Sequence, residues 1–241
     1  MELPPHFWVA LGEIILVNII LSGDNAVVIA LASRNLPPRH RNNAIVLGSV
    51  GAIVLRIIFC LFVATLMGIP YLKLVGSALL LWIGVKLLVP EEEHGDENGV
   101  AAPSNIWSAV RTIIIADAVM SLDNAIAIAA AAKNDYILIT LGLVISIPLI
   151  IFGSQLILKI MGRFPIIITI GAGLIGWIAG DVGITDPSVH HFVVDYGVWP
   201  DYAAKVGGAA LVVALGKFFA ARAAQRRKDT HKPLVDLETG N

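Results

Sequence analysis

Long apolar runs alternate with short polar segments along the chain, and seven runs are long enough to predict helices that cross a membrane. A membrane-spanning helix needs roughly 20 mostly apolar residues. The predicted spans cover residues 7–33, 44–68, 71–89, 106–132, 136–161, 165–184 and 203–221. Two segments are clearly polar, the acidic linker 90–105 and the tail 225–241, and we expect the tail to be disordered.

Two stretches within the apolar runs repeat one another. ILSGDNAVVIA (20–30) and VMSLDNAIAIA (119–129) both place Ser-x-Asp-Asn-Ala inside apolar sequence, and the match extends into the spans that follow. Because each repeat holds three spans, the second copy must lie inverted relative to the first. We therefore predict an all-α polytopic membrane protein, with seven transmembrane helices arranged as two inverted three-helix repeats plus a seventh helix. Many secondary transporters have this build, with the substrate site near mid-membrane.

This interpretation divides the chain into six segments. They are the first repeat (1–89), an acidic cytoplasmic linker (90–105), the inverted second repeat (106–184), an outer loop (185–202), the seventh helix (203–224) and a disordered cytoplasmic tail (225–241). Lys and Arg concentrate on the cytoplasmic side of membrane proteins. Thirteen of the 17 lie at one set of span ends, and three, Lys73, Lys133 and Lys205, lie at the other. We thus expect the N-terminus outside and the C-terminus in the cytoplasm.

Composition agrees with a membrane protein and narrows the function. The chain is 57% hydrophobic and 15% charged, against about 25% charged residues in soluble domains. Its net charge of −1 gives no reason to expect nucleic-acid binding. The single cysteine, Cys60, excludes an intrachain disulfide and a multi-cysteine metal site.

Carboxylates and amides inside the predicted spans carry the candidate chemistry. The set comprises Glu13, Asn18, Asp24, Asn25, Asp117, Asp123, Asn124, Gln155 and Asp181. One charge at the centre of a membrane helix costs about 2.5–3.5 kcal/mol, so several predict a site where they face one another, water or a cation. Their hard oxygens suit Mg²⁺, Ca²⁺ or Mn²⁺ better than Cu⁺ or Zn²⁺.

Helical spacing predicts that these side chains converge. Asn18 and Asn25 are seven residues apart and share one face of a helix. The same relation recurs in the second repeat, between Asp117 and Asn124. The glycine that follows Ser22 is expected to loosen the first span just before the motif aspartate and to free a backbone carbonyl there.

Glu13 and Asp24 are eleven residues apart, about three turns, and also share a face. Asp24 and Asp123 stand in mid-span, at the depth where the two repeats would meet. Arg56, near the centre of the second span, can serve as counter-ion for these acids and take their charge when no cation is bound. Two plainer interpretations stay open: Glu13 can be merely interfacial, and the two aspartates can be structural hydrogen-bonding groups.

Three other polar features have a structural and a metal-binding interpretation. Asp181 can be a metal ligand or can cap the end of the sixth span. The acidic residues 91–97 of the linker can bind metal or can simply be solvated. His190 and His191 in the outer loop can bind metal, although a packed or exposed pair is the commoner arrangement.

The stretches SGDNAVVIALAS (22–33) and ADAVMSLDNAIAIAA (116–130) make the chain resemble the TerC family of integral membrane proteins, in particular its YjbE-type branch. The resemblance covers nearly the whole chain apart from the tail. It implies a metal-ion transporter of the bacterial cytoplasmic (inner) membrane, commonly for manganese efflux. It also implies that four residues are the motif positions: Asp24, Asn25, Asp123 and Asn124. By the same resemblance Asp117 fills an acidic place before the second motif, where the first half has Asn18.

Several functions compete. The leading prediction is a transporter of a divalent cation, Mn²⁺ above others, that works by alternating access, with protons as coupling ion and no tightly bound cofactor. Export of a small organic cation or an amino acid would need aromatic walls, and only 7% of the residues are aromatic. An intramembrane aspartyl protease would need a Gly-x-Gly-Asp turn, whose first glycine WIAGD (177–181) lacks, so we expect no enzyme. A non-transporting membrane helper that supports metal loading of other proteins stays open.

Overall fold

The computed structural model describes residues 5–21, 23–89, 105–132 and 135–230. Within these ranges the chain is all-helical and contains no strand, as the apolar pattern predicts. The helices are α1 (Pro5–Leu21), α2 (Gly23–Ser33), α3 (Pro38–Met67), α4 (Leu72–Leu88), α5 (Ile106–Ala131), α6 (Tyr136–Arg163), α7 (Ile166–Ile184), α8 (Pro187–Val193) and α9 (Trp199–Thr230), with a short 3-10 helix η1 (Val194–Tyr196) between the last two. The acidic residues 91–97 lie outside the described ranges.

Three helix bounds differ from the expected spans. α3 begins at Pro38, because proline fits the first turn of a helix, where its missing N–H has no partner to lose. The expected outer loop 185–202 holds α8, η1 and the start of α9. α9 continues to Thr230, so the first residues of the expected disordered tail are helical.

Several helices have the length and composition of membrane spans. In the described part of the chain four do so alone: Pro38–Phe62, Tyr136–Arg163, Ile166–Ile184 and Trp199–Gln225. The count rises to six if each of two bent helix pairs is one span. α4, with 17 residues, is about 25 Å long, somewhat less than the roughly 30 Å hydrocarbon core. The count of seven spans and the inverted repeat therefore stay predictions.

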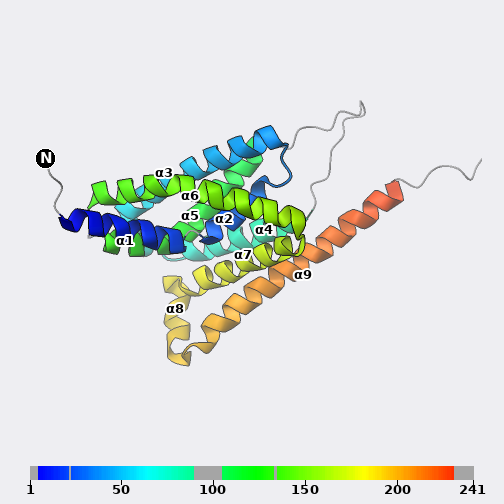
Figure 1. Cartoon of the computed structure of the whole chain (residues 1–241). Coiled ribbons are helices and arrows are strands. Elements are labelled where there is room, and N and C mark those ends of the chain that lie inside the picture. Colours follow the sequence, from blue (N-terminus) through cyan, green and yellow to red (C-terminus); the bar gives the residue numbers. More distant parts are fainter. Residues whose placement is uncertain (1–4, 22, 90–104, 133–134, 231–241) are drawn as a thin grey trace, which may run out of the picture.

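α2 lies at the centre of the bundle (Figure 1). On one side it contacts α3, α5 and α6, and α1 packs against α5 and α6. On the other side it contacts α7, which packs against α4 and α9. Large apolar side chains such as Phe152 on α6 are exposed on the outside of the bundle. Such an exposed apolar surface is typical of contact with lipid.

Glycines allow α7 and α9 to pack closely against each other. A Cβ atom on Gly176 would lie 2.8 Å from the carbonyl carbon of Gly208, and one on Gly180 would lie 2.8 Å from the Cα atom of Lys205. Small residues let membrane helices approach until their backbones touch. This contact attaches α9, the long helix at the edge of the bundle in Figure 1, to α7, and α9 also packs against α4.

Asp186 is fully buried and caps the N-terminus of α4, although it lies far from that helix in the sequence. Its carboxylate accepts hydrogen bonds from the N–H groups of Tyr71, Lys73 and Leu74 at 3.1, 3.1 and 3.2 Å. Burial alone would raise the pKa of Asp186, but hydrogen bonds from Ser188 and from the backbone of Tyr71 and Leu74 lower it below its ordinary value. Asp186 therefore acts as an N-cap supplied from outside the helix.

Candidate functional site

Both copies of the repeated motif lie where a helix bends. The segments Leu11–Asn18 and Gly23–Ser33 meet at 48°, and Ile106–Leu122 and Asn124–Ala130 meet at 59°. The first bend coincides with the glycine that was expected to loosen the span, and Asp24 stands in the first turn of α2. Asp123 is the residue at the second bend, and its side chain lies outside what the structure describes. The two motif aspartates thus occupy corresponding places on two bent helices.

Arg56 on α3 reaches the middle of the polar set and is 1% exposed. Its guanidinium forms an ion pair with Asp117 on α5 and donates to Asn18 Oδ1 on α1 at 2.8 Å. Arg56 Nε also donates to Ser121 Oγ at 2.9 Å, and Ser121 donates to the second carboxylate oxygen of Asp117 at 3.0 Å. Asn18 Nδ2 in turn donates to Ser146 on α6. The network joins four helices in the interior of the bundle.

Asn25, beside this network, has a buried amide with no hydrogen-bond partner. The residue is 2% exposed, and among the described residues neither Oδ1 nor Nδ2 has a hydrogen-bond partner. Its side chain and that of Asp117 line the same small gap between α2 and α5. A buried polar group without a partner costs about 1–3 kcal/mol. The Asn25 N–H donates to Asp24 Oδ1 at 2.7 Å, which fixes the motif carboxylate beside the amide.

The structure places the other predicted site residues in different surroundings. Asp181 on α7 forms an ion pair with Lys205 on α9 at 3.0 Å, and its side chain is 46% exposed. Glu13 and Gln155 are exposed on α1 and α6, whereas Asn124 is partly buried on α5. A ligand role for these residues stays a prediction.

No group of three or more His, Cys, Asp or Glu side chains among the described residues has the arrangement of a metal site. His190 and His191 lie on the short helix α8, where His191 is exposed. A cation held near Arg56 would therefore depend on amide, hydroxyl or backbone oxygens in addition to carboxylates, together with any contribution from Asp123.

Two serines that were not among the predicted site residues belong to the network. Ser121, the first residue of the second motif, is one helical turn after Asp117. This spacing indicates that the two side chains are neighbours on one face of the helix. Ser146 lies in an apolar run on α6, and no local pattern connects it with Asn18. The contact follows from the packing of α1 against α6.

The arrangement offers a set of hard oxygens around one buried cation, the guanidinium of Arg56. The carboxylate of Asp117 and the amide oxygen of Asn18 already neutralise or solvate that guanidinium. A metal ion that used the same oxygens would have to displace the arginine, since both are cations. Asn25 adds a buried amide that has no hydrogen-bond partner among the described residues and lies across a small gap from Asp117.

Comparisons with known proteins show the family to which the chain belongs. The chain matches the integral membrane protein TerC family over residues 3–228. It is 38% identical over 191 residues to the uncharacterized membrane protein YjbE of Bacillus subtilis (strain 168), a match that covers 79% of this chain and 86% of that protein. It is 28% identical over 178 residues to the UPF0053 inner membrane protein YgdQ of Escherichia coli (strain K12), covering 67% of this chain and 74% of YgdQ. No solved structure matches it significantly. The chain belongs to the TerC family of integral membrane proteins.

Proposed function

We propose that this protein transports a divalent metal cation, with Mn²⁺ as the favoured cargo and export from the cytoplasm as the direction. The observation that carries the proposal is the position of both repeated motifs at helix bends, beside a buried cluster of hard-oxygen side chains. Secondary transporters commonly build their ion sites from interrupted membrane helices. The family is associated with ion and metal transport. The side-chain chemistry supports a hard divalent cation, and the preference for Mn²⁺ is what the resemblance to the TerC family implies.

Asp24, Asn25, Asp117 and Asp123 form the proposed ion site, with Asn18 and Asn124 as further amide ligands. Asn25 supports this assignment most directly, because its buried oxygen has no partner in the described part of the chain and its side chain lines the same gap as Asp117. Carboxylate and amide oxygens are the ligands that Mn²⁺ and Mg²⁺ take in proteins. A coordinating cation would give the Asn25 oxygen the partner that it lacks.

Arg56 is proposed to alternate with the metal as the cation of the site. Its guanidinium already binds Asp117 and Asn18. Arg56 therefore neutralises the negative charge of Asp117 when no metal ion is bound. Arrival of a divalent cation would release Arg56 from Asp117, and its departure would restore the ion pair. Such an exchange avoids leaving an isolated carboxylate in the membrane, which is costly. Protons are the proposed coupling ion, since aspartates can carry them in exchange for metal.

The proposal includes the full topology: seven spans and an inverted repeat in the bacterial inner membrane. The N-terminus lies outside and the C-terminus lies in the cytoplasm. Bends at corresponding motifs, 48° in one half and 59° in the other, support the repeat. A reporter fused after Asn241 should be active only in the cytoplasm, and one inserted at residues 194–197 only outside. The opposite pattern would refute both the orientation and the assigned direction of export.

Mn²⁺ flux into liposomes that contain the purified protein tests the site. Replacing Asp117 or Asp24 by Asn keeps the shape of the side chain and removes its charge. A unit charge near a cation contributes about 4 kcal/mol at 4 Å in partly screened surroundings. Each substitution should therefore lower the apparent affinity for Mn²⁺ more than about 100-fold. Asp123→Asn should have the same effect, because the repeat makes Asp123 equivalent to Asp24.

Asp195→Asn is the matched control, because Asp195 is an exposed aspartate in η1, outside the proposed site. It should transport at the wild-type rate. Wild-type Mn²⁺ flux in folded Asp24→Asn, Asp117→Asn and Asp123→Asn proteins would refute the ion site. Flux of an organic cation or an amino acid without Mn²⁺ flux would favour the other exporter, and absence of all flux would favour the helper function.

A further inference from the structure

A groove of about 440 Å³ opens between α4 and α5, at the end of the bundle where α4 ends and α5 begins. α4 lines it with Leu79, Trp82 and Lys86, which are three and four residues apart and share one face. α5 lines it with Trp107, Arg111 and Ile115, which recur every four residues. We call it the α4–α5 groove. It is separate from the network around Arg56, with which it shares none of its lining residues.

The groove changes from apolar to basic along the axis of the bundle. The two helices run in opposite directions, so Leu79 and Ile115 lie deepest, Trp82 and Arg111 follow, and Lys86 lies near the end. Leu79 and Lys86 are separated by about 10 Å of helix rise. A phospholipid has the same order of groups, with acyl chains in the membrane interior and a phosphate at its surface.

The two tryptophans indicate that the end of the groove near Lys86 lies at the membrane surface. Trp82 is 59% exposed and Trp107 is 66% exposed, although both are large and mostly apolar. Tryptophan is enriched at the boundary between lipid and water, where its ring meets the headgroups. Lys86 Nζ lies 5.4 Å from the centre of the Trp82 ring, so the charge is held beside the aromatic side chain.

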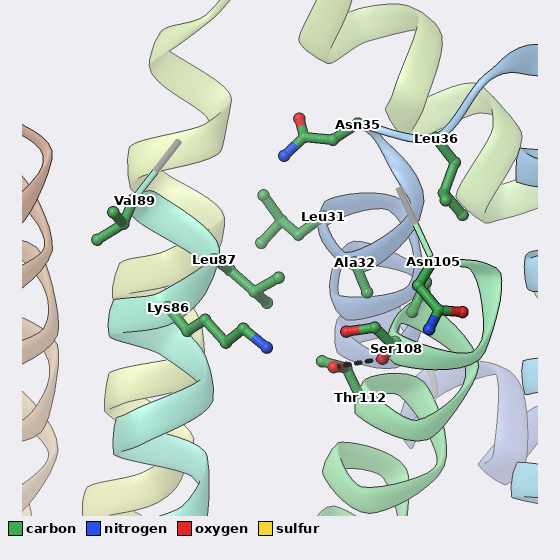
Figure 2. Close-up of a pocket in the computed structure, with 11 residues that line it drawn as sticks. Leu31, Ala32, Asn35, Leu36, Lys86, Leu87, Val89, Asn105, Ser108 and Thr112 are labelled. Carbon is green, nitrogen blue, oxygen red and sulfur yellow. Dashed lines mark hydrogen bonds between the residues drawn. The ribbon is translucent and has the colours of Figure 1, made fainter. Parts of the chain in front are cut away.

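The basic side chains of the groove have no acidic partner among the described residues. Neither Lys86 nor Arg111 forms an ion pair there, and the groove lining contains no Asp or Glu. Figure 2 shows Lys86 extending from α4 toward Ser108 and Thr112 on α5, in the pocket of about 30 Å³ that adjoins the groove. An anion between the two helices could thus receive charge from Lys86 and Arg111.

We propose that the α4–α5 groove binds an anionic phospholipid, with its phosphate between Lys86 and Arg111 and an acyl chain along Leu79 and Ile115. Basic pockets between membrane helices bind anionic headgroups in this way. A soluble anion would leave the apolar half of the groove unused. The chain's own linker carries acids, PEEEHGDE at 90–97, but no large apolar residue that would fill that half. The proposal does not depend on the transported ion.

Quenching of tryptophan fluorescence by brominated lipid tests the proposal in the full-length protein. The protein is placed in phosphatidylcholine bilayers that contain a minor fraction of brominated phosphatidylglycerol or, for comparison, brominated phosphatidylcholine. Trp8, Trp177 and Trp199 are changed to Phe, so that the signal comes from Trp82 and Trp107. Brominated phosphatidylglycerol should quench more strongly than the same fraction of brominated phosphatidylcholine. Lys86→Gln and Arg111→Gln should each weaken the apparent affinity about five-fold.

Lys159→Gln is the matched control, because Lys159 is an exposed lysine near the end of α6, outside the groove. It should leave the preference for phosphatidylglycerol unchanged. A second measurement keeps all tryptophans: phosphatidylglycerol should raise the Tm of the wild-type protein in detergent, and the Lys86→Gln/Arg111→Gln double variant should lose this shift.

Three results would overturn the proposal. The first is equal quenching by the two brominated lipids together with no Tm shift. The second is loss of the preference when inorganic phosphate is added at constant ionic strength, which would assign the groove to a soluble anion. The third is a preference that appears only after Glu91, Glu92 and Glu93 are changed to Gln, which would assign the groove to the linker.

Discussion

Removal of the Arg56 charge is the most informative perturbation of the buried network. Arg56 is 1% exposed and its guanidinium donates to Asp117, Asn18 and Ser121, on two other helices. Arg56→Gln leaves the Asp117 carboxylate buried without a counter-ion. Loss of one member of a buried ion pair costs about 3–5 kcal/mol. We expect the free energy of unfolding to fall by that amount.

A double-mutant cycle separates the ion pair from simple loss of packing. In Arg56→Gln/Asp117→Asn both charges are gone, so the double variant should be more stable than Arg56→Gln alone. The coupling energy should be about 2–3 kcal/mol, at the upper end for residues in contact. Unfolding in mixed detergent micelles, followed by tryptophan fluorescence, measures the free energy of unfolding of the wild-type protein, the two single variants and the double variant. Arg163→Gln, at an exposed position near the end of α6, should change stability by less than about 0.5 kcal/mol.

Addition of Mn²⁺ to the same samples connects this stability with the proposed function. A ligand that binds only the folded state stabilises it according to its concentration relative to Kd. Without the competing guanidinium, Arg56→Gln should gain more stability from Mn²⁺ than the wild-type protein, and the double variant should gain little. If Arg56→Gln costs less than about 1 kcal/mol, or if the two single effects simply add, the ion pair does not hold the network as described.

Two further predictions concern the α7–α9 contact and the cap of α4, both away from the network around Arg56. Gly208→Ala should destabilise the protein by about 1–3 kcal/mol in the same unfolding assay, because a Cβ atom there would collide with the backbone of Gly176. Gly207→Ala is the control: its Cβ atom would meet nothing within 4 Å, so it should be neutral or slightly stabilising. Asp186 has a lowered folded-state pKa, so its stabilisation is fully present above the unfolded-state value of about 3.9 and is lost as the pH falls through the folded-state value. Asp186→Asn should therefore destabilise the protein at neutral pH and flatten the acid part of its stability curve, and Asp195→Asn should leave the curve unchanged.

The helical architecture and much of the polar cluster could be predicted from the sequence. Long apolar runs leave few alternatives to helices, because backbone groups in lipid must pair within their own segment. Acids and amides in such runs are costly, so the presence of Asn18, Asp117 and Arg56 there predicts that they meet. The structure places these three in direct contact across three helices.

Contacts that depend on distant packing could not be predicted in this way. Asp186 lies 115 residues after Tyr71, and nothing in either local sequence indicates that its carboxylate caps α4. Ser146 is one of several hydroxyls in α6, and only the packing of α1 beside α6 selects it as the partner of Asn18. From the sequence Asp181 could be a metal ligand or a cap at the end of the sixth span, and nothing local indicates that Lys205 on the neighbouring helix α9 is its partner.

The bend in α5 cannot be predicted from the residue pattern that explains the bend between α1 and α2. In the first half, Gly23 precedes the motif aspartate and explains an interruption, since glycine is a poor helix former. In the second half, Leu122 stands at the equivalent place, and α5 nevertheless bends by 59° there while its residues stay helical. Glycine is therefore not what the two bends share. They share the motif itself, and in the second half Ser121 of that motif is bound to Asp117 and Arg56. Asp117 and Ser121 both precede the bend, so the ion pair and hydrogen bonds to Arg56 anchor the segment of α5 that ends at Leu122.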